Sequence, residues 1–148
     1  FTPLVVALWS WQAKRGAEPA TLTKMALGCL GVTIANLIMA AAAWHAGDAK
    51  ASWLWLLGYF VVITVGELYI SPIGLSLVSK VAPVRMLSMM MGVWLATSFP
   101  GNFIAGWLGS FWSAMPKVHF FLMIAIIAGL AAAAIAALGR PLRAILDP

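Results

Sequence analysis

The sequence predicts an all-α polytopic membrane protein, and three observations carry this prediction. Of the 148 residues, 64% are hydrophobic and only 9% are charged, whereas soluble domains carry roughly 25% charged residues. Several apolar stretches are close to or longer than the roughly 20 residues that a helix needs to cross a bilayer. Most charged residues stand in the short connectors between these stretches. This composition cannot build a water-facing surface, which excludes a soluble globular domain.

The first apolar segment, residues 1–11, is too short to cross a membrane, because it covers only about 16 Å as a helix. It begins without a Met or a preceding basic region, so a signal peptide is a poor interpretation. We expect this segment to be the second half of a span. We therefore also expect the chain to be part of a longer protein.

Each of the remaining four apolar segments is predicted to be a complete span. They are residues 25–44, 53–78, 86–112 and 120–138. The first is uncharged and contains Asn36, the second holds a single charge, Glu67, and the third holds no charge. Together with the partial span, residues 1–148 are predicted to form one transmembrane helical region.

The connectors orient these spans, because loops rich in Lys and Arg stay on the cytoplasmic side of a membrane. Successive connectors lie on opposite sides. One side collects seven of the nine cations: Lys14, Arg15, Lys24, Lys80, Arg85, Arg140 and Arg143. The other side keeps only Lys50 and Lys117. We predict that the first side and the C-terminus are cytoplasmic, and that the net charge of +5 reflects this bias rather than nucleic-acid binding.

Glu67 is the first candidate functional residue, because it lies near the middle of the predicted span 53–78. A central acidic residue raises the free energy of membrane insertion by roughly 2.5–3.5 kcal/mol, and such residues are usually functional. We interpret Glu67 as a carboxylate that faces a water-filled cavity, where it carries a proton or pairs with a cationic group of a substrate. The alternative is a protonated glutamate that is hydrogen-bonded to a neighbouring helix.

The residues that follow Glu67 favour a cavity. Pro72 removes a backbone donor and clashes with the carbonyl of Leu68, which predicts a kink one turn from the carboxylate. Broken helices occur in membranes where they line a cavity or are buried in protein. Ser71 and Gly74 share a helix face with Glu67. For Ser71, a hydrogen bond to its own helix is an equally good interpretation.

The predicted span 86–112 repeats this pattern of polar and helix-breaking residues. Trp94, Ser98 and Asn102 are spaced by four and could line one polar stripe, and Pro100 and Gly101 stand beside them. Trp94 lies too deep for an interfacial aromatic belt, so ligand contact and ordinary packing are the two interpretations. A ridge of small residues permits close helix packing: Gly101, Ala105 and Gly109.

The remaining titratable residues give no sign of catalysis. His45 and His119 stand in predicted connectors, and Cys29 is interpreted as a small packing residue. The sequence contains no His, Cys and carboxylate cluster with metal-ligand spacing, no phosphate loop and no evident nucleophile–base pair. We expect neither an enzyme nor a metal site.

Four stretches resemble three helices of the proton-coupled oligopeptide transporter (POT) family of the major facilitator superfamily. The tenth helix of that family resembles residues 66–76, Gly-Glu-Leu-Tyr-Ile-Ser-Pro-Ile-Gly-Leu-Ser. Its eleventh helix resembles residues 90–106, and its eighth helix with the following loop resembles Thr2-Pro3 and residues 15–24. The resemblance implies the C-terminal part of a major facilitator fold, helices 8 to 12, with four full transmembrane helices and one partial.

The resemblance also implies roles for individual residues. Glu67 matches a glutamate that holds the amino terminus of the peptide and forms a gating salt bridge to the N-terminal bundle. Ser71, Trp94 and Ser98 match positions of the substrate pocket. Thr2 stands where many members have an asparagine that contacts the peptide, so the chain departs from the family pattern there.

The function implied is proton-coupled symport of di- and tripeptides by alternating access, with the proton as coupling ion and no other cofactor. The partners implied are small peptides, the lipid bilayer and an N-terminal six-helix bundle of the same protein, without nucleic acid. The expected location is the bacterial inner membrane. Pro72, Pro100 and Gly101 are the hinge candidates, since kinks there would let the ends of these helices bend.

Two alternatives remain. One is a major facilitator transporter of a non-peptide substrate, such as nitrate, an amine or a drug. An anion carrier would gain nothing from Glu67. The other is a non-transporting membrane subunit, in which Glu67 pairs with a basic residue of a partner helix.

Overall fold

The computed structural model describes residues 21–47 and 49–146, with side chains described as far as residue 139. Every regular element in this part of the chain is a helix. The long elements are α2 (Thr21–Ala46), α3 (Trp53–Val81), α4 (Leu87–Ala96), α5 (Ser98–Gly109) and α6 (Lys117–Leu146). Two short 3-10 helices, η1 (Val84–Met86) and η2 (Ser110–Ser113), connect them. The partial span predicted at residues 1–11 lies outside the described residues.

Three helices are long and apolar enough to cross a membrane: α2, α3 and residues Lys117–Gly139 of α6. They contain the predicted spans 25–44, 53–78 and 120–138. The structure therefore confirms the prediction of an all-α polytopic membrane protein.

The helix ends follow from local chemistry. The Ser52 hydroxyl accepts a hydrogen bond from the Leu54 amide at 3.4 Å and caps the start of α3. Gly47 follows α2 with a positive φ of 53°, a conformation that favours glycine. Pro83 follows the extended residue Ala82, which ends α3. Pro116 lies directly before α6. The first N–H groups of a helix have no acceptor within it, so the missing N–H of this proline does not weaken the helix.

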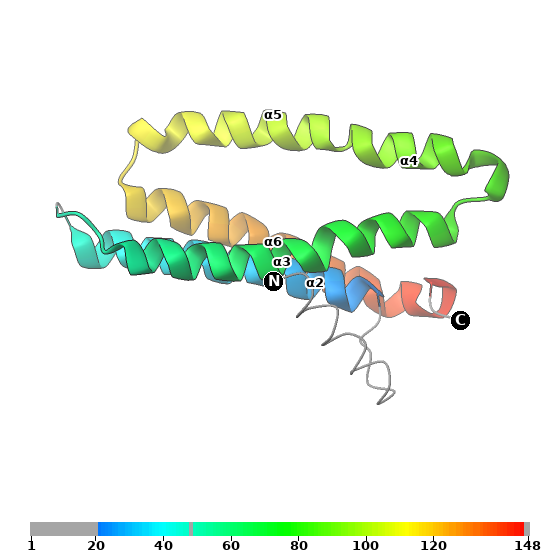
Figure 1. The fold of residues 1–148 in the computed structure, drawn as a ribbon, viewed down its shortest axis with the longest axis horizontal. Coiled ribbons are helices and arrows are strands. Elements are labelled where there is room, and N and C mark those ends of the chain that lie inside the picture. The colour runs from blue at the N-terminus through cyan, green and yellow to red at the C-terminus, as the bar shows by residue number, and fades with distance from the viewer. Residues whose placement is uncertain (1–20, 48, 147–148) are drawn as a thin grey trace.

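The helices α2, α3 and α6 lie side by side, and α2 contacts both of the others (Figure 1). Small residues form their contacts: the buried hydrophobic side chains include Ala26, Ala35, Ala40 and Ala42 of α2 and Ala125 and Ala132 of α6. Many of the large apolar side chains, such as Leu30 and Ile34, are exposed. This inverted arrangement suits a lipid environment, in which helices associate through close backbone contact rather than through burial of large side chains.

The predicted span 86–112 contains two helices that follow each other in one line, α4 and α5, and Figure 1 shows this line beside and apart from the α2, α3 and α6 layer. The break between α4 and α5 is one residue long, at Thr97. The ring of Pro100 would clash with the carbonyl of Ala96 in a continuous helix, and a proline is tolerated in the first turn of a new one. A single crossing over residues 86–112 stays a prediction.

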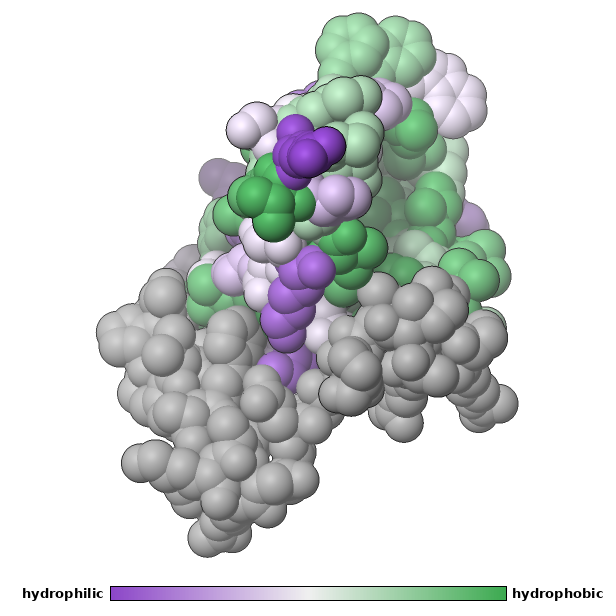
Figure 2. All heavy atoms as spheres, turned by 90° about the vertical axis from the view of Figure 1, so that its right-hand side faces the viewer, coloured by the Kyte–Doolittle hydropathy of each residue, from purple (hydrophilic) through white to green (hydrophobic). Residues whose placement is uncertain are grey.

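The two ends of the bundle differ in charge. Lys24 lies at the start of α2, while Lys80 and Arg85 lie at and just after the end of α3. Figure 2 shows this end of the molecule, where several hydrophilic side chains are exposed with hydrophobic side chains around them. At the opposite end, Lys50 lies in the connector between α2 and α3, and Lys117 is the first residue of α6.

Candidate functional site

Glu67 lies near the middle of α3 with its side chain exposed. The residue before it, Gly66, is buried against α2. Adjacent helix residues point about 100° apart, at 3.6 residues per turn, so a glutamate that follows this glycine is turned away from α2. Among the described residues none forms an ion pair or hydrogen bond with Glu67. Its carboxylate is therefore free to meet a group from outside the described helices.

The contact that holds α3 at this level consists of glycines. A Cβ atom on Gly31 would lie 3.0 Å from the Gly66 Cα, and one on Gly66 would lie 2.9 Å from the Gly28 carbonyl oxygen. The two backbones touch here, and glycine is needed on both helices. The crossing sets the position of α3 one residue from the carboxylate.

Ser71 and Gly74 continue the face of Glu67, one and two turns along α3. Ser71 is exposed, and Gly74 is buried beneath the indole of Trp94. A Cβ atom on Gly74 would collide with the six-membered ring of that tryptophan. The structure thus brings Trp94 from α4 onto the face of Glu67, about 10 Å further along α3 at 1.5 Å per residue.

Ser98 and Asn102 are exposed on α5, one and two turns after Trp94. Between them and α4, the Thr97 hydroxyl donates a hydrogen bond to the Trp94 carbonyl oxygen at 2.6 Å. Because α5 lies apart from α3 (Figure 1), the described helices do not bring Ser98 against Glu67. Thr2, the remaining predicted substrate residue, lies outside the described residues.

The three hinge candidates lie in different surroundings. Helix α3 continues through Pro72, and its second half leaves the line of the first and approaches α4 (Figure 1). Pro100 lies in the first turn of α5, directly after the break at Thr97. Gly101 is exposed, with open space where a Cβ atom would lie. Their action as hinges stays a prediction.

Some residues that form the contacts between these helices, or that are buried in them, were not singled out from the sequence. Gly28 and Gly31 stand three residues apart on α2, a spacing of small residues that could have indicated a helix contact. Nothing in the sequence indicated Gly66 as their partner. Asn36 is 4% exposed in α2, and its side-chain amide donates to the Val32 carbonyl oxygen at 2.8 Å. In the part of the chain that the structure describes, no group of three His, Cys, Asp or Glu residues could hold a metal ion.

Comparison with known proteins decides the family. The sequence model of the POT family matches residues 1–135. The chain belongs to the POT family. It is 39% identical over 106 residues to a peptide transporter of Yersinia enterocolitica, an alignment that covers 68% of this chain and 21% of the relative.

Two further relatives extend this comparison. A di-/tripeptide transporter of Lactococcus lactis is 36% identical over 127 residues, which cover 85% of this chain and 25% of the relative. Dipeptide and tripeptide permease A of Escherichia coli is 31% identical over 123 residues, which cover 82% of this chain and 24% of that protein. The POT-family chain thus spans about a quarter or less of the length of the curated relatives that it matches. No solved structure matches it significantly.

Proposed function

We propose that this chain supplies the C-terminal part of a proton-coupled symporter that takes up di- and tripeptides by alternating access. The observation that carries the proposal is the setting of Glu67. It is the one charge between Trp53 and Ser79 of α3, its side chain is exposed, and the described residues offer it no ionic partner. Membership of the POT family supports the same function, as do relatives named as transporters of short peptides.

In this proposal the Glu67 carboxylate binds the amino group of the peptide. The attraction between an ammonium and a carboxylate is several times stronger in a site of reduced dielectric than in water. Ser71, one turn on, offers a hydroxyl to the peptide backbone. The indole of Trp94, held in place by Gly74, bounds the site two turns from the carboxylate.

The proposed cycle needs a second helix bundle. The bundle that contains α3 and α4 rocks against this second bundle about a central site. In one state Glu67 pairs with a cation of that N-terminal six-helix bundle, and in the other it pairs with the peptide. Proton movement resets the cycle. The bend of α3 beyond Pro72 and the break at Thr97, close to Pro100 and Gly101, would let the helix ends open and close the site. Ser98 would complete this half of the pocket only if α5 moves toward α3 during the cycle, and Thr2 would add to it from outside the described residues.

We also propose that the protein resides in a bacterial inner membrane with its C-terminus in the cytoplasm. Lys24, Lys80 and Arg85 at one end of the bundle support this orientation. The bacterial sources of the relatives support the location.

The experiment is uptake of a labelled dipeptide into liposomes that contain the protein as its gene encodes it. We expect uptake that requires an inward proton gradient and falls by about 30-fold or more in Glu67→Gln, because the proposed pair of Glu67 and the peptide ammonium is enclosed between the two bundles when peptide is bound, and removal of one partner of such a pair has about this effect. Ser79→Ala is the control, because its hydroxyl is exposed near the far end of the same helix and donates only to the Leu75 carbonyl oxygen.

The outcomes separate the proposal from its rivals. Full uptake by Glu67→Gln would leave the peptide carrier standing but remove Glu67 from its site. Uptake of an amine or a drug in place of peptides would replace the substrate class. If no substrate is transported and Glu67→Gln fails to assemble with a partner, the chain belongs to a non-transporting subunit.

A further inference from the structure

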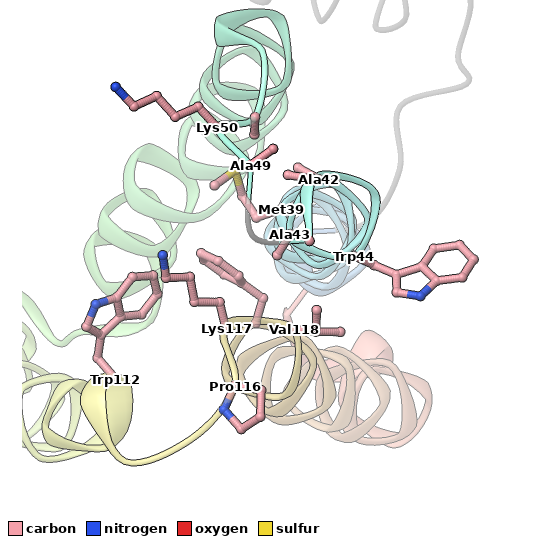
Figure 3. Close-up of a pocket in the computed structure, with 14 residues that line it drawn as sticks. Met39, Ala42, Ala43, Trp44, Ala49, Lys50, Trp112, Pro116, Lys117 and Val118 are labelled. Carbon is pink, nitrogen blue, oxygen red and sulfur yellow. The ribbon is translucent and has the colours of Figure 1, made fainter.

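A cavity lies at the opposite end of the bundle from Lys80 and Arg85. It is surrounded by the end of α2, the connector to α3, and the connector from η2 to α6 (Figure 3). Its volume is about 870 Å³, within the range of about 300–1,000 Å³ that is typical of small-molecule sites. Glu67 lies about 20 Å further along α3, at 1.5 Å per residue. The cavity is therefore separate from the proposed peptide site.

The walls of this cavity are apolar and its rim is cationic. Met39 and alanines of α2 form one wall, and Trp112 and Phe121 form another. The lining also includes Lys50 and Lys117, and the described lining contains no acidic residue. Asp48, in the same connector as Lys50, lies outside the described residues. An anion with an apolar portion matches this lining.

Aromatic side chains lie beside Lys117. Its ammonium lies 5.8 Å from the centre of the Trp112 ring, and Trp112 stacks edge-on against Phe120 at 5.1 Å and against Phe121 at 5.7 Å. In Figure 3 the Lys117 side chain extends toward Trp112. Lys50 stands on the other rim with its ammonium directed away from Lys117, on a flexible stem that can follow a ligand.

The cavity also lies at the level of the membrane interface. Trp44 and Trp53, at the adjoining ends of α2 and α3, are 80% and 69% exposed. Exposed tryptophans at helix ends are typical of the headgroup region of a bilayer. Phospholipid phosphates surround the protein at this depth, and the acyl chains begin just below them.

We propose that this cavity binds the headgroup of an anionic phospholipid, with the phosphate between Lys50 and Lys117 and the first acyl carbons against the alanine and methionine wall. Lysine side chains close to a membrane surface attract anionic headgroups, and each contributes about 1 kcal/mol.

The test uses the protein as its gene encodes it, purified in detergent and titrated with phosphatidylglycerol or with phosphatidylcholine of the same acyl chains. Native mass spectrometry measures lipid retention, and the midpoint of thermal unfolding measures stabilisation. We expect preferential retention of phosphatidylglycerol. Its affinity should fall about fivefold with each of Lys50→Gln and Lys117→Gln, since a lysine near a lipid surface contributes about that factor.

Two matched variants and two soluble ligands make the result specific. Lys117→Arg should keep the preference, and Lys80→Gln, which removes one positive charge at the other end of the bundle, should leave it unchanged. Glycerol phosphate and inorganic phosphate at the same concentration should not stabilise the protein. Equal weakening by Lys80→Gln, stabilisation by free phosphate, or a dipeptide whose binding depends on Lys50 and Lys117 would each overturn the proposal.

Discussion

At the scale of single residues, the neighbours of Glu67 explain why an acidic side chain is tolerated in α3. Gly66 faces α2 so closely that the next residue must turn away from it. The carboxylate then occupies a face of α3 that also presents Ser71, and Trp94 covers this face two turns further on, at Gly74. This leaves room for a substrate group beside the charge.

The contact between Gly74 and Trp94 is open to a double-mutant test. We expect Gly74→Ala to lower the free energy of unfolding by about 1–3 kcal/mol, because the added methyl group overpacks the site. Replacing the indole by a smaller ring, in Gly74→Ala with Trp94→Phe, should restore much of this loss. The measurement is thermal unfolding in detergent of both single variants and the double variant. Strictly additive effects would mean that the two residues do not meet in the working protein.

At the scale of elements, the crossing of α2 and α3 depends on backbone contact rather than on side-chain fit. A methyl group on Gly66 would meet the Gly28 carbonyl oxygen on one side and the Val32 amide nitrogen, at 3.3 Å, on the other. Backbone atoms cannot move aside as a flexible side chain can. The only relief is to separate the helices, and this would displace Glu67 as well.

A pair of glycine variants on α3 tests this crossing. We expect Gly66→Ala to destabilise the protein by about 1–3 kcal/mol and to reduce peptide uptake. Gly58→Ala is its control on the same helix, because nothing lies within 4 Å of the Cβ position there. Alanine is the better helix former, so this control should be neutral or stabilising by about 0.5–1 kcal/mol. Equal unfolding midpoints for the two variants would contradict the crossing.

At the scale of the whole molecule, the distribution of charge predicts the orientation of the bundle. Lys24, Lys80 and Arg85 lie at one end, and Lys50 and Lys117 lie at the other. The positive-inside rule predicts that the first end faces the cytoplasm. In that orientation, the cavity proposed to bind lipid and the exposed tryptophans lie on the outer side of the membrane.

Cysteine labelling in cells tests this orientation. In a protein whose Cys29 is replaced by Ala, we expect Ala49→Cys to react with a membrane-impermeant maleimide on intact cells. Val84→Cys, which is 92% exposed in η1, should react only after the inner membrane is permeabilised. The reverse pattern would invert the topology and place the lipid cavity in the inner leaflet.

Much of the architecture could be predicted from the sequence by itself. Hydrophobic length located the segments that hold α2, α3 and α6, because a bilayer demands about 20 apolar residues from each helix. Proline chemistry indicated the region of the break between α4 and α5. The run at residues 66–76 indicated the POT family. The isolated charge singled out Glu67 as a candidate site residue, and its role stays a prediction.

What only the tertiary structure decided are the contacts between segments that are distant in the chain. The sequence did not predict that Gly28 and Gly31 contact Gly66. Nor did it predict that the Trp94 indole packs against Gly74, or that Lys50 and Lys117 line one cavity. Helix formation depends on local hydrogen bonds and hydrophobic length, both of which can be read along one segment. A helix crossing depends on which small residues of two segments meet, and that is determined only when the helices pack in three dimensions.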